Sequence, residues 1–149
     1  IKANEDEPDF ENTIVALETA SEKLSMVTGI FYNQLYCNGE DKLEALADEI
    51  GPLNANFSSD VSLDPDLFAR VKAVYDNRAS YDLSAEKITL LEDTYTGFVR
   101  GGALLNDEDK QTLRDINEQT STLGPAFSQN VKKSADDFQR SSAMSSSAA

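Results

Sequence analysis

The stretch DFENTIVALETASEKLSMVTGIFYNQLY, residues 9–36, decides the fold of this chain. Its apolar residues recur at steps of three, four or seven, which draws one apolar stripe along a helix. The stripe consists of Phe10, Ile14, Leu17, Leu24, Phe31 and Leu35, with Ser21 and Thr28 in the intervening positions. Asp9 precedes the stripe and is a good helix-capping residue. We expect a long helix from about Phe10 to Tyr36, with Gly29 as the weak point where it would bend.

The sequence after this helix predicts a turn and a second helix. Asn38–Asp41 reads Asn-Gly-Glu-Asp, a turn signal, and a helix should begin near Asp41. Its inner face would be Leu43, Leu46, Ala47 and Ile50. Gly51-Pro52 predicts a stop, because proline disfavours helical geometry in the residue before it. However, Leu53, Phe57 and Val61 continue at helical spacing, so a kinked helix reaching about Asp60 stays open as the alternative.

Three further helices have clear start signals. Asp64-Pro65, Ser84 and Asn106 each place a capping side chain before a run with helical periodicity. The first run extends to about Arg78 with Leu67, Phe68, Val71, Val74 and Tyr75 on one face; the second carries Ile88, Leu91, Tyr95 and Phe98 and ends at Gly101-Gly102. The third carries Leu113, Ile116, Leu123, Phe127 and Val131, and Gly124-Pro125 should kink it.

These patterns predict an all-α fold, an antiparallel helical bundle of four to six helices, some of them kinked. Residues 1–133 would form one helical domain, which the length of 149 residues allows. Residues 134–149 form a tail rich in Ser and Ala, of natural or vector origin. The chain opens on Ile1 rather than Met, and we expect it to begin downstream of its natural start. A cytoplasmic location is expected, and a periplasmic one stays open for the same reason.

The charge balance excludes some classes of partner. The chain has 27 Asp and Glu against 13 Lys and Arg, a net charge of −14. A surface that binds phosphates needs clustered positive charge, so neither nucleic acid nor an anionic membrane is an expected partner. The longest apolar run, residues 14–17, is far below the roughly 20 residues that span a bilayer.

The absence of histidine is the most informative count. Zinc enzymes take most of their ligands from His and Cys, and hydrolytic triads use His as the general base. The chain has no His and one Cys, so we expect no catalytic, cofactor-binding or metal-binding residue in it. Cys37 lies at the end of an apolar-periodic segment, where a buried or half-buried position is usual.

Several acidic and aromatic groups have rival explanations. Glu18 and Glu22 share a helix face, as in carboxylate-bridged metal sites, but the Glu-x-x-His elements of such sites are missing. Asp60, Asp64 and Asp66 bracket a loop that could attract Ca²⁺, without the ligand order of an EF-hand. We interpret both sets as solvated or capping residues. We expect the aromatic residues on the apolar stripes to lie in the core, namely Phe10, Phe31, Phe68, Tyr75, Tyr95, Phe98 and Phe127. Phe57 lies inside the glycosylation pattern Asn56-Phe57-Ser58 and is also expected in the core.

Ordered blocks of sequence resemble the N-terminal region of the M3 (thimet oligopeptidase-like) family of zinc metallopeptidases. The blocks lie at family-like spacing over about residues 5–131, and the likeness is slightly closer to the bacterial peptidyl-dipeptidases than to the oligopeptidase A type. They are Pro8–Glu18 (PDFENTIVALE), Leu67–Val71 with Val74 and Tyr75, Phe98–Leu105 (FVRGGALL), Asp109-Lys110 with Leu113, Ile116 and Asn117, and Leu123 with Phe127–Asn130.

The resemblance implies a larger enzyme that cuts short peptides with one zinc ion, which the two His of an H-E-x-x-H helix and a downstream Glu hold. None of those residues is present here. The family's N-terminal helices form one wall of a channel that admits oligopeptides. We therefore expect the partners to be the missing catalytic domain of the same polypeptide and short peptides. An apolar face left exposed would dock that domain or be covered by dimerisation. A free-standing helical module that binds another protein is the alternative.

Overall fold

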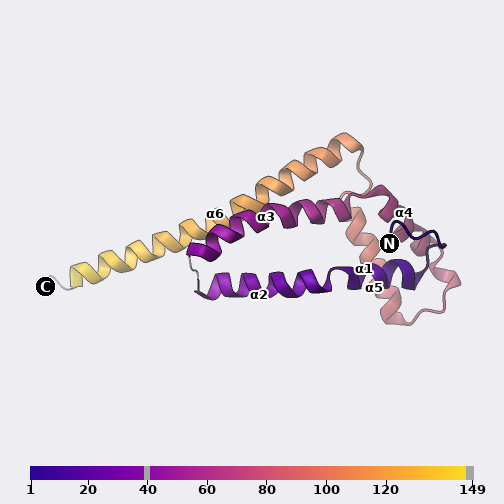
Figure 1. Ribbon diagram of the computed structural model, residues 1–149, viewed down its shortest axis with the longest axis horizontal. Helices are drawn as coiled ribbons and strands as arrows, with labels where there is room; N and C mark the ends of the chain where they lie inside the picture. The colour runs from indigo at the N-terminus through magenta and orange to yellow at the C-terminus, as the bar shows by residue number, and fades with distance from the viewer. Residues whose placement is uncertain (39–40, 147–149) are drawn as a thin grey trace.

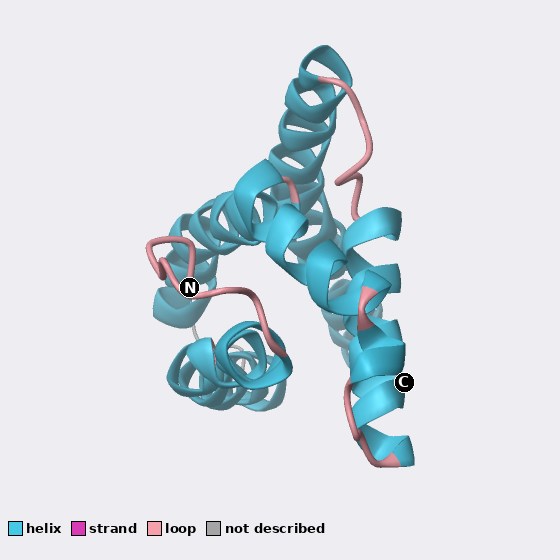
Figure 2. Cartoon of the chain, turned by 90° about the vertical axis from the view of Figure 1, so that its right-hand side faces the viewer, coloured by secondary structure: helices cyan, strands magenta, loops and turns pink. Residues whose placement is uncertain are grey.

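The computed structural model describes the backbone of residues 1–38 and 41–146, and every regular element in those ranges is a helix (Figures 1 and 2). The elements are the π-helix η1 (Phe10–Val15), α1 (Ala16–Ala20), α2 (Glu22–Asn38), α3 (Asp41–Ser62), α4 (Pro65–Asp76), the 3₁₀-helix η2 (Arg78–Ser80), α5 (Ala85–Arg100) and α6 (Asp107–Ser146). The predicted all-α class is confirmed. Antiparallel pairing is seen between α3 and α6, which run side by side in opposite directions.

The long helix predicted from Phe10 to Tyr36 is divided into η1, α1 and α2. Its start is confirmed, because the Asp9 carboxylate accepts a hydrogen bond of 2.7 Å from the Asn12 N–H. The Asn12 side chain accepts one of 3.1 Å from the Asp9 N–H in return. The interruption falls at Ser21, where the backbone leaves helical geometry at φ −101° and ψ 4°. The prediction that Gly29 is the weak point was wrong: Gly29 lies inside α2.

The other start signals act as the sequence predicted. The side chains of Asp64, Ser84 and Asn106 each accept a hydrogen bond from the backbone N–H three residues later. α3 continues through Pro52, so the alternative of a helix that passes Gly51-Pro52 holds rather than the stop, and α6 continues through Pro125. The predicted turn at 38–41 includes Gly39 and Glu40, which lie outside the described residues. The Ser- and Ala-rich stretch belongs to α6 as far as Ser146.

The best-packed core lies at one end of the molecule, where η1, α4 and α5 meet. Ile14, Val71, Val74 and Leu91 are at most 1% exposed there. Rings from α4 and α5 stack beside them: Phe68 lies 5.9 Å from Tyr95 and 6.1 Å from Phe98, measured between ring centroids. The apolar faces predicted for α4 and α5 are therefore confirmed in this core, except that Ile88 is 39% exposed.

α3 and α6 form a long pair that extends away from this core (Figure 1). The buried Ser59 hydroxyl accepts a hydrogen bond of 3.1 Å from the Asn117 amide. Arg114 binds Asp60 at 2.6 Å, and Lys132 binds Glu44 at 3.1 Å, so polar contacts tie the pair near both ends of α3. The Cα of Gly51 also comes close to the α6 backbone, because a Cβ there would lie 3.3 Å from the Ser121 carbonyl oxygen.

Several residues predicted to be buried are exposed. Phe57 is 50% exposed and Phe127 is 70% exposed, so their assignment to the core was wrong. The same is true of stripe residues on α2, α3 and α6, namely Leu24, Leu46, Ile116, Leu123 and Val131. The physical reason is that periodicity shows which face of a helix is apolar, but not whether the same chain supplies something to cover it. These faces find no cover among the described residues.

The N-terminal segment is held against α4 by long polar side chains. Arg70 donates to the carbonyl oxygens of Asn4 and Asp6 and to the Asn12 side chain, at 2.9, 3.2 and 2.9 Å. The Lys2 ammonium lies 2.5 Å from the Asp64 carboxylate that caps α4. Partial burial works to raise the pKa of Asp64, but Lys2 and the Leu67 N–H stabilise its charged form, and the net pKa is below the ordinary value.

We predict that Leu91→Ala lowers the free energy of unfolding by about 2–5 kcal/mol, because it removes a fully buried side chain and leaves a cavity. The control is Leu104→Ala, in a loop where the side chain is 65% exposed, and it should cost no more than about 0.5 kcal/mol. Urea unfolding followed by circular dichroism measures both. Equal effects of the two substitutions would show that the core lies elsewhere.

We also predict a pH-dependent contribution from Asp64. Its pKa is lower in the folded state, so the charged carboxylate stabilises the fold above the unfolded pKa of about 3.9, and this is lost as the pH falls through the folded pKa. Asp64→Asn retains a capping side chain but no charge. The difference in urea midpoint between wild type and Asp64→Asn should therefore narrow from pH 6 to pH 2. Asp66→Asn, at a side chain 76% exposed, is the control. A difference in urea midpoint between wild type and Asp64→Asn that stays constant from pH 6 to pH 2 would contradict the lowered pKa of Asp64.

Candidate functional site

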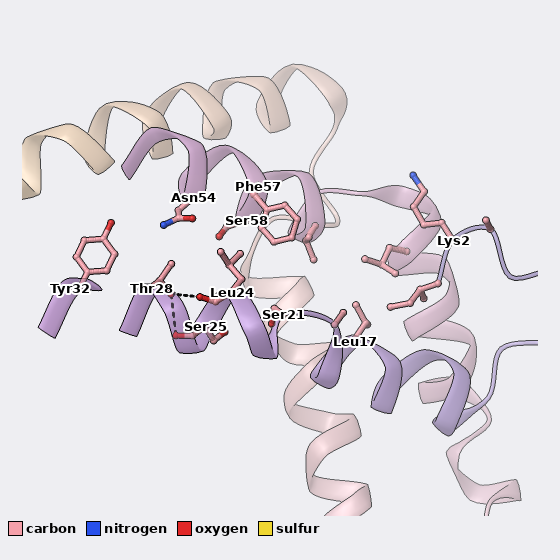
Figure 3. A pocket seen from close by; sticks show the side chains of 15 residues that line it. Lys2, Leu17, Ser21, Leu24, Ser25, Thr28, Tyr32, Asn54, Phe57 and Ser58 are labelled. Carbon is pink, nitrogen blue, oxygen red and sulfur yellow. Dashed lines mark hydrogen bonds between the residues drawn. The ribbon is translucent and has the colours of Figure 1, made fainter. Parts of the chain in front are cut away.

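A groove of about 920 Å³ lies between α1 and α2 on one side and α3 on the other (Figure 3). Leu24 and Thr28 on α2 face Phe57 and Ser58 on α3 across it. The N-terminal residues close one end. The full lining is Ile1, Lys2, Ala3, Leu17, Ala20, Ser21, Leu24, Ser25, Thr28, Tyr32, Asn54, Phe57, Ser58, Val61 and Leu67.

The lining of the groove is poor in charge. Of the 15 side chains drawn there, one is charged, that of Lys2, whereas an average share of 27% would place about four. The Lys2 ammonium is itself paired with the Asp64 and Asp66 carboxylates, at 2.5 and 3.6 Å. A chain with a net charge of −14 therefore keeps its acidic residues out of this groove. Such a lining suits an apolar surface rather than an ion.

Some of the polar groups in the lining are already satisfied by their own helix. The Thr28 hydroxyl donates to the Leu24 carbonyl at 2.8 Å and lies 3.2 Å from the Ser25 carbonyl (Figure 3). Its hydrogen-bonding capacity is thus used within α2, in the way that Thr commonly bonds back to the preceding turn. The groove can accordingly bind an apolar or weakly polar segment.

The acidic candidates from the sequence are not brought together in a metal site. Glu18 and Glu22 are exposed, on either side of the break at Ser21. Asp60 binds Arg114, while Asp64 caps α4 and, with Asp66, binds Lys2. The oxygens that would have ligated calcium thus face cations of the protein itself, which would repel Ca²⁺.

The residues of this chain do not fit the catalytic zinc that the sequence resemblance implies. The sequence has no His. Among the described residues, no three Asp, Glu or Cys side chains gather in a group that could hold a metal ion. Cys37 is exposed rather than buried or half-buried as predicted, and its thiol lies 3.9 Å from the Asn33 side chain. No hydrolytic step can be derived through a metal held by these side chains.

Sequence reasoning did not find the groove. Its two walls are the consecutive helices α2 and α3, and the space between them depends on how these helices leave the core. The available signal was the apolar character of residues such as Leu24 and Phe57, which the sequence pattern could only assign to the core.

Among the described helices, none combines the length and the apolar composition that crossing a membrane requires.

The chain is similar in sequence to known proteins over most of its length. It is 37% identical over 131 residues to a dipeptidyl carboxypeptidase of Escherichia coli, a match that covers 88% of this chain and 19% of that protein. It is 37% identical over 124 residues to the dipeptidyl carboxypeptidase of Salmonella typhimurium, covering 83% of this chain and 18% of the relative. A probable cytosolic oligopeptidase A of Arabidopsis thaliana is 22% identical over 134 residues, covering 90% of this chain and 19% of the relative. No protein-family model matches the chain.

The chain thus spans about a fifth of the length of the relatives it matches. All of them are peptidases of one family, the family that the ordered sequence blocks resemble. The chain therefore belongs to the M3 (thimet oligopeptidase-like) peptidases, as a partial region related to the dipeptidyl carboxypeptidases.

Proposed function

We propose that this chain is the N-terminal helical region of a zinc-dependent oligopeptidase and forms a wall of the channel that admits short peptides. The observation that carries the proposal is the 37% identity to dipeptidyl carboxypeptidase over 88% of the chain. The name of that relative indicates the reaction for the complete protein, release of dipeptides from the carboxyl end of a peptide. In this proposal, residues 1–133 form the helical domain. The complete enzyme is cytoplasmic, with a periplasmic location as the alternative.

The chemistry in this proposal comes from outside the chain. A zinc ion held elsewhere in the complete enzyme would lower the pKa of a bound water and make it a nucleophile. This chain would supply shape: helices with a firm core at one end, where Ile14, Val71 and Leu91 are buried, and long helices that extend from that end. A wall of this kind restricts which peptides reach a catalytic centre without touching the reacting atoms.

The exposed apolar residues support a role within a larger structure. Val27, Leu123 and Phe127 are each more than 60% exposed, on two different helices. Apolar faces of this extent are unusual on an isolated monomer and commonly mark an interface. The remainder of the polypeptide would cover such faces, although a dimer of this chain would do so as well.

A free-standing helical module that binds a partner protein is the second candidate function, and the uncharged groove favours it. An apolar helix is a common occupant of such a groove. The reading frame distinguishes the candidates: a frame that continues into an H-E-x-x-H segment supports the peptidase, and a natural stop near Ala149 supports the module.

We predict that the isolated chain with added Zn²⁺ releases no dipeptide from a short peptide. A chimera, in which this chain replaces the matching region of the E. coli relative, should release dipeptides. The E. coli protein lacking that region is the control and should be inactive, because one wall of the channel is gone. The assay follows peptide cleavage by mass spectrometry after equal metal loading.

Two results would contradict this proposal. Zinc-dependent hydrolysis by the isolated chain that survives repurification would place the chemistry in this chain. A folded chimera without activity, beside an active E. coli enzyme, would show that the chain cannot serve as the corresponding region.

A further inference from the structure

We propose that the groove between α2 and α3 is a docking site in which an uncharged, apolar face from the remaining four-fifths of the same polypeptide is seated. This inference rests on the proposed function, since it takes the complete protein to be about as long as its relatives. It adds the place of contact and the chemistry of the contacting surface, neither of which the sequence relationship supplies.

The first argument is that the groove is already formed before anything occupies it. Its α3 wall is fixed from behind by α6, through the Asn117–Ser59 hydrogen bond and the Arg114–Asp60 ion pair. Its α2 wall continues along the chain from η1 and α1, and Ile14 of η1 is buried in the core. Little reordering of the α3 wall is therefore needed on docking, which favours association.

The second argument is the half-exposed apolar surface inside the groove. Leu24 is 42% exposed and Phe57 is 50% exposed, on opposite walls, and they face each other in Figure 3. Deeper in the lining, Val61 is half-buried and Leu67 is buried. Water covers the two rim residues in the isolated chain, and an apolar occupant would displace it favourably.

The third argument concerns charge and selects the occupant. The groove has no charged side chain other than Lys2, which Asp64 and Asp66 already neutralise. A charged segment would lose its hydration there without gaining a partner, so the occupant must be uncharged. A second copy of this chain brings another 14 net negative charges, and the repulsion between copies disfavours it. A segment of the same polypeptide is present at high effective concentration and meets no such barrier.

Protection of a cysteine in the groove tests the proposal. Ser58→Cys places a thiol in the groove with little change in shape, and Ser80→Cys places a matched thiol at an exposed position outside it. Both are made with Cys37→Ser, because Cys37 is exposed. Maleimide labelling is timed at each site by mass spectrometry, in the isolated chain and in the E. coli chimera described above. Circular dichroism checks that every variant is folded.

We expect Ser58→Cys to label at least about tenfold more slowly in the chimera than in the isolated chain, because docking removes the groove from water. Ser80→Cys should label at rates within about twofold of each other in the two proteins. As a second variant, Phe57→Glu should restore fast labelling of Ser58→Cys in the chimera, because a carboxylate in the groove opposes an apolar occupant.

Equal labelling of Ser58→Cys in the two proteins would overturn the proposal, even if the chimera is an active peptidase. Slow labelling in the isolated chain that becomes fast on dilution would show that a second copy fills the groove, and would also overturn it. The proposed function is judged separately, by the activity of the chimera. A folded chimera that is inactive but protects Ser58→Cys would leave the docking site standing and reject the peptidase role.

Discussion

The contact between η1, α4 and α5 is the constraint on which the rest of the structure depends. Ile14 from the first helical turn packs among Val71 and Val74 of α4 and Leu91 of α5, and water reaches almost none of this surface. Ile14 is more than 50 residues from the other three in sequence. Their contact sets the directions in which α2 and α3 leave the core, and the groove between the two helices follows from those directions.

The starts of the helices could be predicted from the sequence, but the burial of their apolar side chains could not. Helix starts at Asp9, Asp64, Ser84 and Asn106 were predicted correctly because a cap needs only the next three residues. The burial of Phe57 and Phe127 was predicted wrongly because it depends on atoms far along the chain or outside it. The break at Ser21 was missed because serine in a helical pattern gives a weaker signal than glycine, yet α2 continues through the exposed Gly29.

Charged side chains are distributed unevenly between the groove and the rest of the molecule. Acidic residues crowd the N-terminal segment, where Lys87 of α5 binds Glu11 at 2.8 Å, while Lys2 of the same segment binds Asp64 at the start of α4. The groove, by contrast, is left neutral. The candidate metal ligands noticed in the sequence are explained by capping and ion pairing, which require the same oxygen atoms. The uncharged groove could not be seen from the sequence, because its lining is assembled from segments that are charged elsewhere along their length.

The π-helical turn at Phe10–Val15 has a consequence for variation in chain length. Its hydrogen bonds span five residues rather than the four of an α-helix, so this turn already contains an additional residue. A deletion of one residue here can be absorbed by a return to α-helical geometry, which leaves the ends of the segment nearly in place. The same deletion within α4 would rotate the following side chains by about 100° and turn Val74 away from the core. Natural differences in length among homologous chains should therefore be tolerated in the first turn and excluded from α4.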